Sequence, residues 1–372
     1  MHSALAHLLV PTRNFLARQM SVSLNRNRRR WTFFLLVFLS LGCTLCAART
    51  SAPPQSDSTL IAALGKRLFF EKRLSANGSV SCATCHSPDK AFSDRRGTSV
   101  GVGAKPLSRN APSLLDVKDR FELFWDGRAR SLEEQAKQPL LNPAEQGFTN
   151  EQSLMDAVAA IPGLSSEFQR AFPQSRASAN LANLCISLAA YEKTLVSGPN
   201  SLDAYLGGHA DALSNSARRG LSLFVGRGGC ARCHSISGNR PSLSDGRYHQ
   251  APLGLSDSIA EQLPELTQRV RALRSKGQFD VLSQLIATQP DIAALGRFLV
   301  TLNPSDIGAF RTPSLRNVAI TAPYMHDGSV PTLERAIALE LYRRDGVGRR
   351  PIELSEDERA DLLAFLNALT TY

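Results

Sequence analysis

Two copies of one short motif constrain this chain more than any other feature. Residues 82–86 (CATCH) and 230–234 (CARCH) both read C-x-x-C-H, the attachment motif of c-type haem. In such a motif two thiols bond to the porphyrin vinyl groups, and the adjacent histidine lies beneath the iron as its proximal ligand. We therefore expect two covalently bound haem c groups, held by Cys82, Cys85, His86, Cys230, Cys233 and His234.

Other uses of paired cysteines fit the sequence less well. A redox dithiol does not require a histidine directly after both cysteine pairs. A single four-cysteine zinc site would need a bridge of 144 residues between Cys85 and Cys230, far beyond the usual spacing of such sites. The fifth cysteine of this part of the chain, Cys185, lies in an apolar helical segment and is expected to be buried and inert.

The first 48 residues are predicted to be a signal peptide. They contain six arginines and no acidic residue, and an apolar run at Thr32–Ala48 ends in small residues. This order is typical of a secretory signal, with cleavage expected near Ala48 and a periplasmic mature protein. The alternatives are a transmembrane anchor, for which about 17 apolar residues is the lower limit, and lipidation at Cys43.

The net charge of +10 would ordinarily suggest nucleic acid or an anionic membrane as a partner. Removal of residues 1–48 leaves a net charge of +4 and no run of Lys and Arg. We therefore expect no nucleic-acid partner, and contact with the membrane only during export.

The fold class is predicted to be mainly α, because helical periodicity recurs and strand-like alternation is scarce. The motifs lie 148 residues apart, which predicts two cytochrome c-like domains with one haem each, at residues 49–200 and 201–372. Ser197–Ser201 is the expected connection. The expected helices are Ser58–Phe70, Ser131–Gln138, Glu151–Ala160, Ala179–Val196, Ser216–Val225, Ser256–Arg274, Thr332–Arg343 and Ser355–Thr370.

The residue opposite each iron decides between electron transfer and chemistry. After His86 the next histidine is His209, and the first methionine after the signal is Met155. The first half therefore offers no obvious loop to close its haem, which predicts an iron open to a small oxidant. A residue from the second half that closes the site is the alternative.

Many further segments resemble the bacterial di-haem cytochrome c peroxidases and the related MauG enzymes. They occur in the same order and extend over nearly all of residues 60–370. The matching segments are Leu64–Phe70, Arg73–Ser75, Ser81–His86, Ala91–Asp94, Arg109–Ser113, Phe124–Arg128, Leu132–Gln135, Asn142–Glu145, Gly229–His234, Phe310–Val318 and Thr321–Gly328.

The resemblance implies roles for individual residues. Glu145 matches the acid/base that moves a proton between the peroxide oxygens, and Gln135 matches a glutamine that positions peroxide. Trp125 matches the tryptophan between the two haems, a relay for electrons or holes. The resemblance also implies one calcium ion, which suits hard oxygen ligands; the matching residues are Asn110 through its side chain, and Thr321 and Pro323 through backbone oxygens.

Two features depart from the family pattern. Typical cytochrome c peroxidases have a histidine loop before the R-N-A-P segment, but Ser87–Ser108 contains no histidine, as in the MauG-like branch. The distal ligand of the second haem is also ambiguous. In the family this ligand follows, at a fixed spacing, the threonine that matches Thr321. Counting the same spacing from Thr321 without gaps leads to Glu340. A two-residue insertion leads to Tyr342, which is favoured, and Met325 is a third candidate.

The sequence thus predicts a periplasmic di-haem peroxidase that reduces hydrogen peroxide with electrons from a small cytochrome or a cupredoxin. One alternative is a MauG-like enzyme that uses peroxide to oxidise residues of a partner protein. The other is a non-enzymatic electron carrier or redox sensor with two six-coordinate haems.

Overall fold

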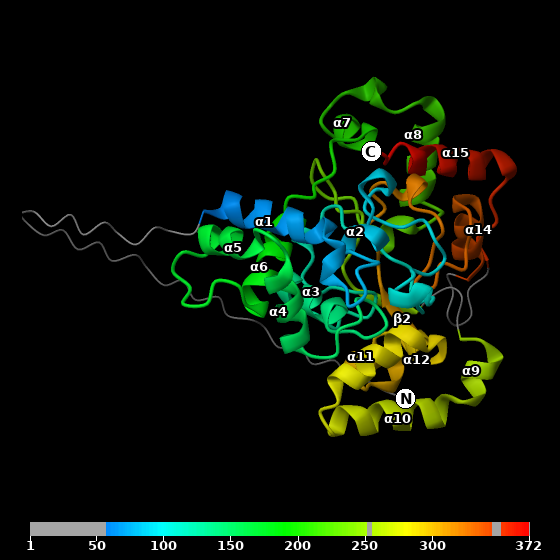
Figure 1. Cartoon of the computed structure of the whole chain (residues 1–372). Helices are drawn as coiled ribbons and strands as arrows, with labels where there is room; N and C mark the ends of the chain where they lie inside the picture. Colours follow the sequence, from blue (N-terminus) through cyan, green and yellow to red (C-terminus); the bar gives the residue numbers. More distant parts are fainter. Residues whose placement is uncertain (1–56, 251–254, 344–350, 372) are drawn as a thin grey trace, which may run out of the picture. The chain divides into compact units, whose positions relative to one another are not determined.

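The computed structural model describes residues 57–250, 255–343 and 351–371, all within one compact unit (Ser51–Tyr372), so the predicted signal peptide lies outside the described residues (Figure 1). Helices dominate, which confirms the mainly α class. The described ranges hold two short strands, β1 (Tyr248–Gln250) and β2 (Ala309–Arg311), which pair antiparallel. No helix in these ranges is long and apolar enough to cross a membrane.

A first group of helices surrounds the first C-x-x-C-H motif. Its core is formed by α1 and α6, with α3 packed against α6. Cys185 is 4% exposed within this core, as expected for a small buried hydrophobe. The members of the group are α1 (Ser58–Phe70), α2 (Cys82–Cys85), α3 (Leu132–Leu140), α4 (Glu151–Ala160), α5 (Leu164–Ala171) and α6 (Leu181–Glu192).

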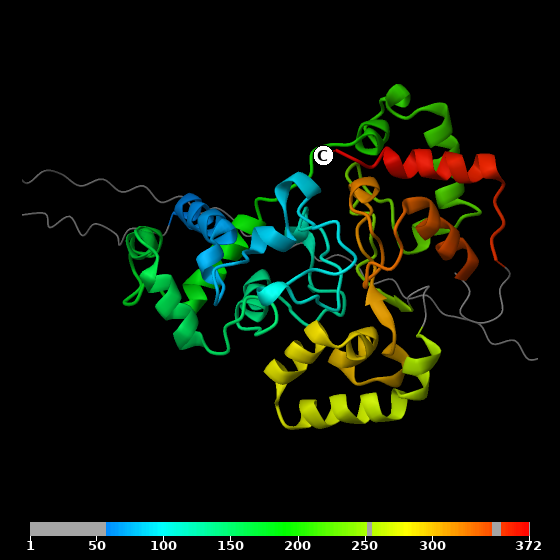
Figure 2. The same cartoon turned by 45° about the vertical axis from the view of Figure 1, so that its right-hand side comes forward.

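A second group surrounds the second motif and has its own hydrophobic core. In Figure 2 it lies apart from α1–α6, with α8 beside α15. Ser355 caps α15, and Glu358 bonds back to the Ser355 amide, so the predicted capping box is present. The members are α7 (Ser201–Leu206), α8 (Asn215–Val225), α14 (Leu333–Arg343) and α15 (Glu356–Asn367).

A third group, coloured yellow in Figure 2, has a separate core. The prediction of one helix over Ser256–Arg274 was wrong, because the chain breaks at Gln262 into two helices. Pro264 at the start of the second helix lacks an amide hydrogen and cannot continue the first one. The members are α9 (Asp257–Glu261), α10 (Leu263–Ser275), α11 (Phe279–Thr288), α12 (Pro290–Ala294) and α13 (Phe298–Thr301).

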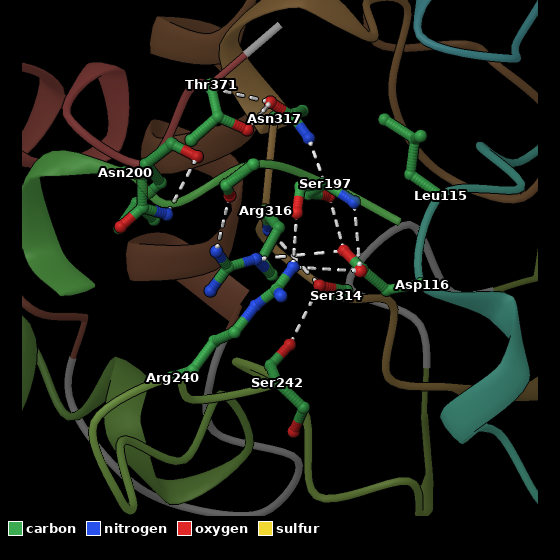
Figure 3. Close-up of polar contacts among 12 residues, drawn as sticks. Leu115, Asp116, Ser197, Asn200, Arg240, Ser242, Ser314, Arg316, Asn317 and Thr371 are labelled. Atoms are coloured by element: carbon green, nitrogen blue, oxygen red, sulfur yellow. Dashed lines mark hydrogen bonds and ion pairs between the residues drawn. The ribbon is translucent and has the colours of Figure 1, made fainter. Parts of the chain in front are cut away.

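The segment Ser197–Ser201, between α6 and α7, is held by a polar network (Figure 3). Asp116 accepts hydrogen bonds from the amide and hydroxyl of Ser197. Asn317 donates to the Ser197 hydroxyl over 3.1 Å, and Arg240 donates to the Ser197 carbonyl. This connection is therefore pinned between residues of both halves of the sequence. A domain boundary at residue 200 remains a prediction.

The first two groups repeat one packing unit. In α1, a Cβ at Gly65 would lie 1.8 Å from the carbonyl oxygen of Ser187 on α6; in α8, a Cβ at Gly220 would lie 2.0 Å from that of Asp361 on α15. Four residues later in each first helix, an aromatic ring meets an aromatic ring of the partner helix edge to face. The pairs are Phe69 with Tyr191 at 5.2 Å and Phe224 with Phe365 at 5.1 Å.

We expect Gly65→Ala and Gly220→Ala each to destabilise the protein by about 2 kcal/mol. The added methyl group would collide with a backbone carbonyl, which outweighs the roughly 1 kcal/mol that alanine gains in helix propensity. Urea denaturation measures the change, and Lys66→Ala at an exposed position of α1 is the control. Wild-type stability of both glycine variants would contradict the close helix contact.

Candidate active site

Each C-x-x-C-H motif lies in the wall of its own cavity. The first cavity is lined by Cys82, Cys85 and His86, and the second by Cys230, Cys233 and His234. None of the five described cysteines forms a disulfide, so the pairs are available as thiols. The second cavity measures about 800 Å³, within the range of ligand sites. The first is narrower, about 170 Å³. The kind of ligand it can hold is therefore judged from the polar atoms in its wall and not from its volume.

Both motif histidines are oriented in the same way. The Nδ1 atom of His86 lies 3.1 Å from the carbonyl oxygen of Phe92, and that of His234 lies 2.9 Å from the carbonyl oxygen of Leu243. An Nδ1–H that donates to a carbonyl leaves Nε2 as the atom that can bind a metal. This second contact of the ring is the usual arrangement of a metal-binding histidine, and both motifs have it.

Arg109 provides a further test of whether haem fits the first cavity. Its side chain lines the cavity and is 12% exposed, and its Nη2 donates to the carbonyl of Ala293. Its Nε and Nη1 atoms are buried and have no hydrogen-bond partner among the described residues. Burial lowers the pKa of Arg109 to about 10, so it stays cationic at neutral pH. An anionic group such as a haem propionate would satisfy these donors.

The predicted distal residues gather in the first cavity. Gln135 lies on α3, and Glu145 follows that helix in a turn. Asn142 is 3% exposed and donates to Glu145 Oε1 over 2.9 Å, which fixes the carboxyl group. Burial raises the pKa of Glu145, while the charge of Arg128 and the Asn142 bond act in the opposite direction. A carboxyl group with a raised pKa is suited to acid/base work near neutral pH.

Trp125 lines both cavities. Its indole Nε1 donates to the carbonyl of Asn110 over 3.0 Å, and its own carbonyl accepts from the amide of Arg311 over 2.9 Å. The ring is therefore held by Asn110, and the backbone of Trp125 is held by Arg311 from the second half of the sequence.

A buried carboxylate holds the loop that carries Trp125. Asp126 is 0% exposed and accepts two hydrogen bonds from the Arg128 guanidinium, at 2.9 and 3.0 Å, and one from the Arg128 amide at 3.2 Å, while Arg109 lies 3.5 Å away. These two cations lower the pKa of Asp126 despite its burial, which acts in the opposite direction. Arg128 also packs over the ring of Phe124 at 3.4 Å.

The residues predicted to hold calcium and the second iron all line the second cavity. They include the calcium candidates Asn110, Thr321 and Pro323. The distal-ligand candidates Met325, Glu340 and Tyr342 lie there too, and Tyr342 is 67% exposed. The structure therefore brings each predicted set together, and the choice among the three ligand candidates stays open.

Reasoning from the sequence gave no role to two residues at the first site. Asn142 positions Glu145, but it stood in the sequence only as part of a matching segment. Glu192 on α6 lines the first cavity and is 5% exposed. A signal for it was available, because it is an acidic residue inside the apolar stretch Ala179–Val196.

Comparisons with known proteins agree with this arrangement. The family model for di-haem cytochrome c peroxidases matches residues 60–211. MauG, the methylamine utilization protein of Methylorubrum extorquens, is 35% identical over 314 residues, which are 82% of this chain and 77% of that protein. The cytochrome c551 peroxidase of Pseudomonas aeruginosa is 33% identical and covers 82% of this chain and 78% of its own.

Solved structures show the same likeness. A MauG-like protein associated with microbial copper homeostasis superimposes with a TM-score of 0.66 at 31% identity, over 86% of this chain and 91% of that one. The di-haem peroxidase BthA of Burkholderia thailandensis has a TM-score of 0.66 at 27% identity, over 85% and 87% of the two chains.

The chain therefore belongs to the di-haem cytochrome c peroxidase and MauG family, oxidoreductases that act on peroxide. The resemblance inferred from the sequence is confirmed. Membership implies two haem groups, in agreement with two motifs in two cavities.

We expect Asp126→Asn to destabilise the protein by about 3 kcal/mol, because it leaves two buried arginines without their counter-charge. Chemical denaturation at neutral pH measures the loss, and Asp119→Asn, at an exposed position of the same region, is the control. The wild-type contribution should disappear as the pH falls through the lowered pKa of Asp126. A variant with wild-type stability would show that the carboxylate does not hold this loop.

Proposed function

We propose that this protein is a periplasmic peroxidase with two cytochrome c-like domains, which binds one haem c at His86 and another at His234 and reduces hydrogen peroxide. The observation that carries the proposal is the pair of cavities, each with a complete C-x-x-C-H motif, that share Trp125 as a common wall. The separate cores and the repeated helix contact support the division near residue 200. The signal-like segment 1–48 supports export.

Cys82, Cys85 and His86 would hold a haem in the first cavity, whose iron would supply the site for peroxide. Glu145 takes a proton from one peroxide oxygen and returns it to the other, so that the O–O bond breaks heterolytically. Asn142 holds the Glu145 carboxyl group in place, and Gln135 helps to position the peroxide. The composition of the cavity wall supports access of peroxide to an iron held by His86, because the described residues of the wall offer no second histidine to close the site. Among the described residues that line this cavity, His86 is the sole histidine, and none is Met, Tyr or Lys.

The second cavity is proposed to take electrons from a small cytochrome or a cupredoxin. Trp125 then relays oxidising equivalents between the cavities. Tyr342 is our preferred distal ligand, with Glu340 and Met325 as the alternatives. An anionic oxygen ligand would lower the potential of a haem bound there.

A calcium ion is proposed beside the second cavity. The Asn110 amide nitrogen donates to the carbonyl of Arg96 over 2.9 Å, which leaves the side-chain oxygen as the atom able to bind a cation. The backbone oxygens of Thr321 and Pro323 would complete the protein ligands.

A second candidate function is oxidation of a partner protein, as in MauG. The likeness to MauG and the absence of histidine from Ser87–Ser108 favour it. Incubation of the protein and peroxide with either reduced cytochrome c or proteins encoded by neighbouring genes separates the two functions. Oxidation of the cytochrome favours the first, and a mass change in a neighbour protein favours the second.

Glu145→Gln tests the proposed chemistry. Glutamine cannot accept a proton, so the rate of reaction with peroxide should fall by about 10²-fold or more in rapid-mixing experiments. The wild-type rate should also fall as the pH drops through the raised pKa of Glu145, and this acid limb should be absent from the variant. Glu151→Gln, at an exposed position of α4, is the control. An unchanged rate would rule out acid/base catalysis by Glu145.

A further inference from the structure

Glu192 is a buried acid that the chemistry above does not use. It ends α6 and lines the first cavity, one helical turn after Leu188 on the same wall. The residue is 5% exposed, and its Oε2 atom has no hydrogen-bond partner among the described residues. A buried polar atom without a partner costs free energy, so its presence calls for a reason.

Bound haem would not supply that partner. Glu192 lies near enough to Cys82 for their charges to interact, and Cys82 is the thiol that takes a vinyl group. Vinyl groups have no hydrogen-bond donor or acceptor, so the part of haem that would attach to Cys82 offers the Glu192 carboxyl group no partner.

A surface ion pair lies beside Glu192. Lys193 follows it in sequence and binds Glu133 of α3 over 2.8 Å, with side chains that are 52% and 33% exposed. The helices α3 and α6 pack together, and the charge of Glu133 is near enough to raise the pKa of Glu192. A half-exposed ion pair thus lies next to a buried acid of the cavity wall.

The surroundings keep a proton on Glu192. Burial raises its pKa to about 8, Glu133 acts in the same direction, and Lys193 opposes them. The other titratable groups that face it are Cys82 and Cys185. At neutral pH Glu192 is accordingly a neutral acid.

We propose that Glu192 passes protons from the Glu133–Lys193 surface pair into the first cavity. The inference rests on the proposed peroxidase function. Reduction of one peroxide breaks the O–O bond, takes two electrons from the donor and two protons from solvent, and yields two waters. Glu145 returns the proton that it takes, so it brings no net proton into the cavity. Glu192 supplies the protons that end in water.

The two acids therefore act at different steps. Loss of Glu145 slows the first reaction with peroxide, whereas loss of Glu192 leaves that step intact and slows the return to the resting state. Glu192→Gln keeps the shape of the side chain and removes the acidic proton of its carboxyl group. Glu134→Gln on α3, next to Glu133 but exposed, is the matched control.

The experiment uses the full haem-loaded protein. Infrared difference spectra across a pH titration should show the C=O stretch of a protonated carboxyl group that is lost near pH 8, and Glu192→Gln should lack this band. After rapid mixing with peroxide and reduced cytochrome c, the variant should react with peroxide at the wild-type rate. It should return to the resting state about 10²-fold more slowly, with an altered solvent isotope effect. Glu133→Gln should slow the return in the same direction.

Two results would overturn the relay: a wild-type rate of return in Glu192→Gln, or an infrared band that the substitution does not remove. Failure of the proposed function looks different, because the wild-type protein itself would then consume no peroxide, and the relay would fall with it. An unchanged visible haem spectrum shows that the variant is folded and loaded.

Discussion

The arrangement depends on one buried carboxylate. Asp126 has no solvent exposure and lies between Arg128 and Arg109, so the loop around it has little freedom to move. That loop carries Trp125, whose ring forms part of the wall of both cavities. Arg109 in turn lines the first cavity and has two buried donors without a partner among the described residues. One ion cluster thus fixes both the wall between the two sites and the cationic side of the first.

The two halves also meet through a second polar cluster. Arg316 is buried and pairs with Asp203, and its Nε atom lies 3.7 Å from Asp116. Asp116 in turn holds the segment between α6 and α7 (Figure 3). Buried ion pairs contribute little net stability, but breaking one leaves a costly charge. Such contacts favour one relative placement of the halves over others. Electron transfer between two redox sites requires a fixed placement of this kind.

Much of the fold could be predicted from the sequence. The helix α1 begins and ends where its periodicity indicated, and α4 does so as well. The break at Gln262 was readable from the sequence, because Pro264 cannot continue a helix, but the longer periodic pattern hid it. The helices α12 and α13, of 5 and 4 residues, are too short to show a helical period and form by packing on their own core, so they could not be predicted.

The candidate site shows the same division. The haem motifs have a fixed local spacing, so sequence alone located them. The Asn142–Glu145 bond is local, since the two residues are three apart in one turn, but no sequence pattern marks it. The place of Glu192 in the first cavity depends on folding, because α3 and α6 are brought together from distant parts of the chain. The distal ligand of the second haem remains a prediction, because Met325, Glu340 and Tyr342 all lie in the wall of one cavity.

The central claim is that the chain holds two haems in unlike environments, one open to peroxide and one closed. Electron paramagnetic resonance of the resting ferric protein tests this most directly, since spin state reports whether the sixth position of each iron is filled. We predict one high-spin signal from the haem of His86 and one low-spin signal from the haem of His234. Two low-spin signals would contradict the account, because neither iron would then be open to peroxide.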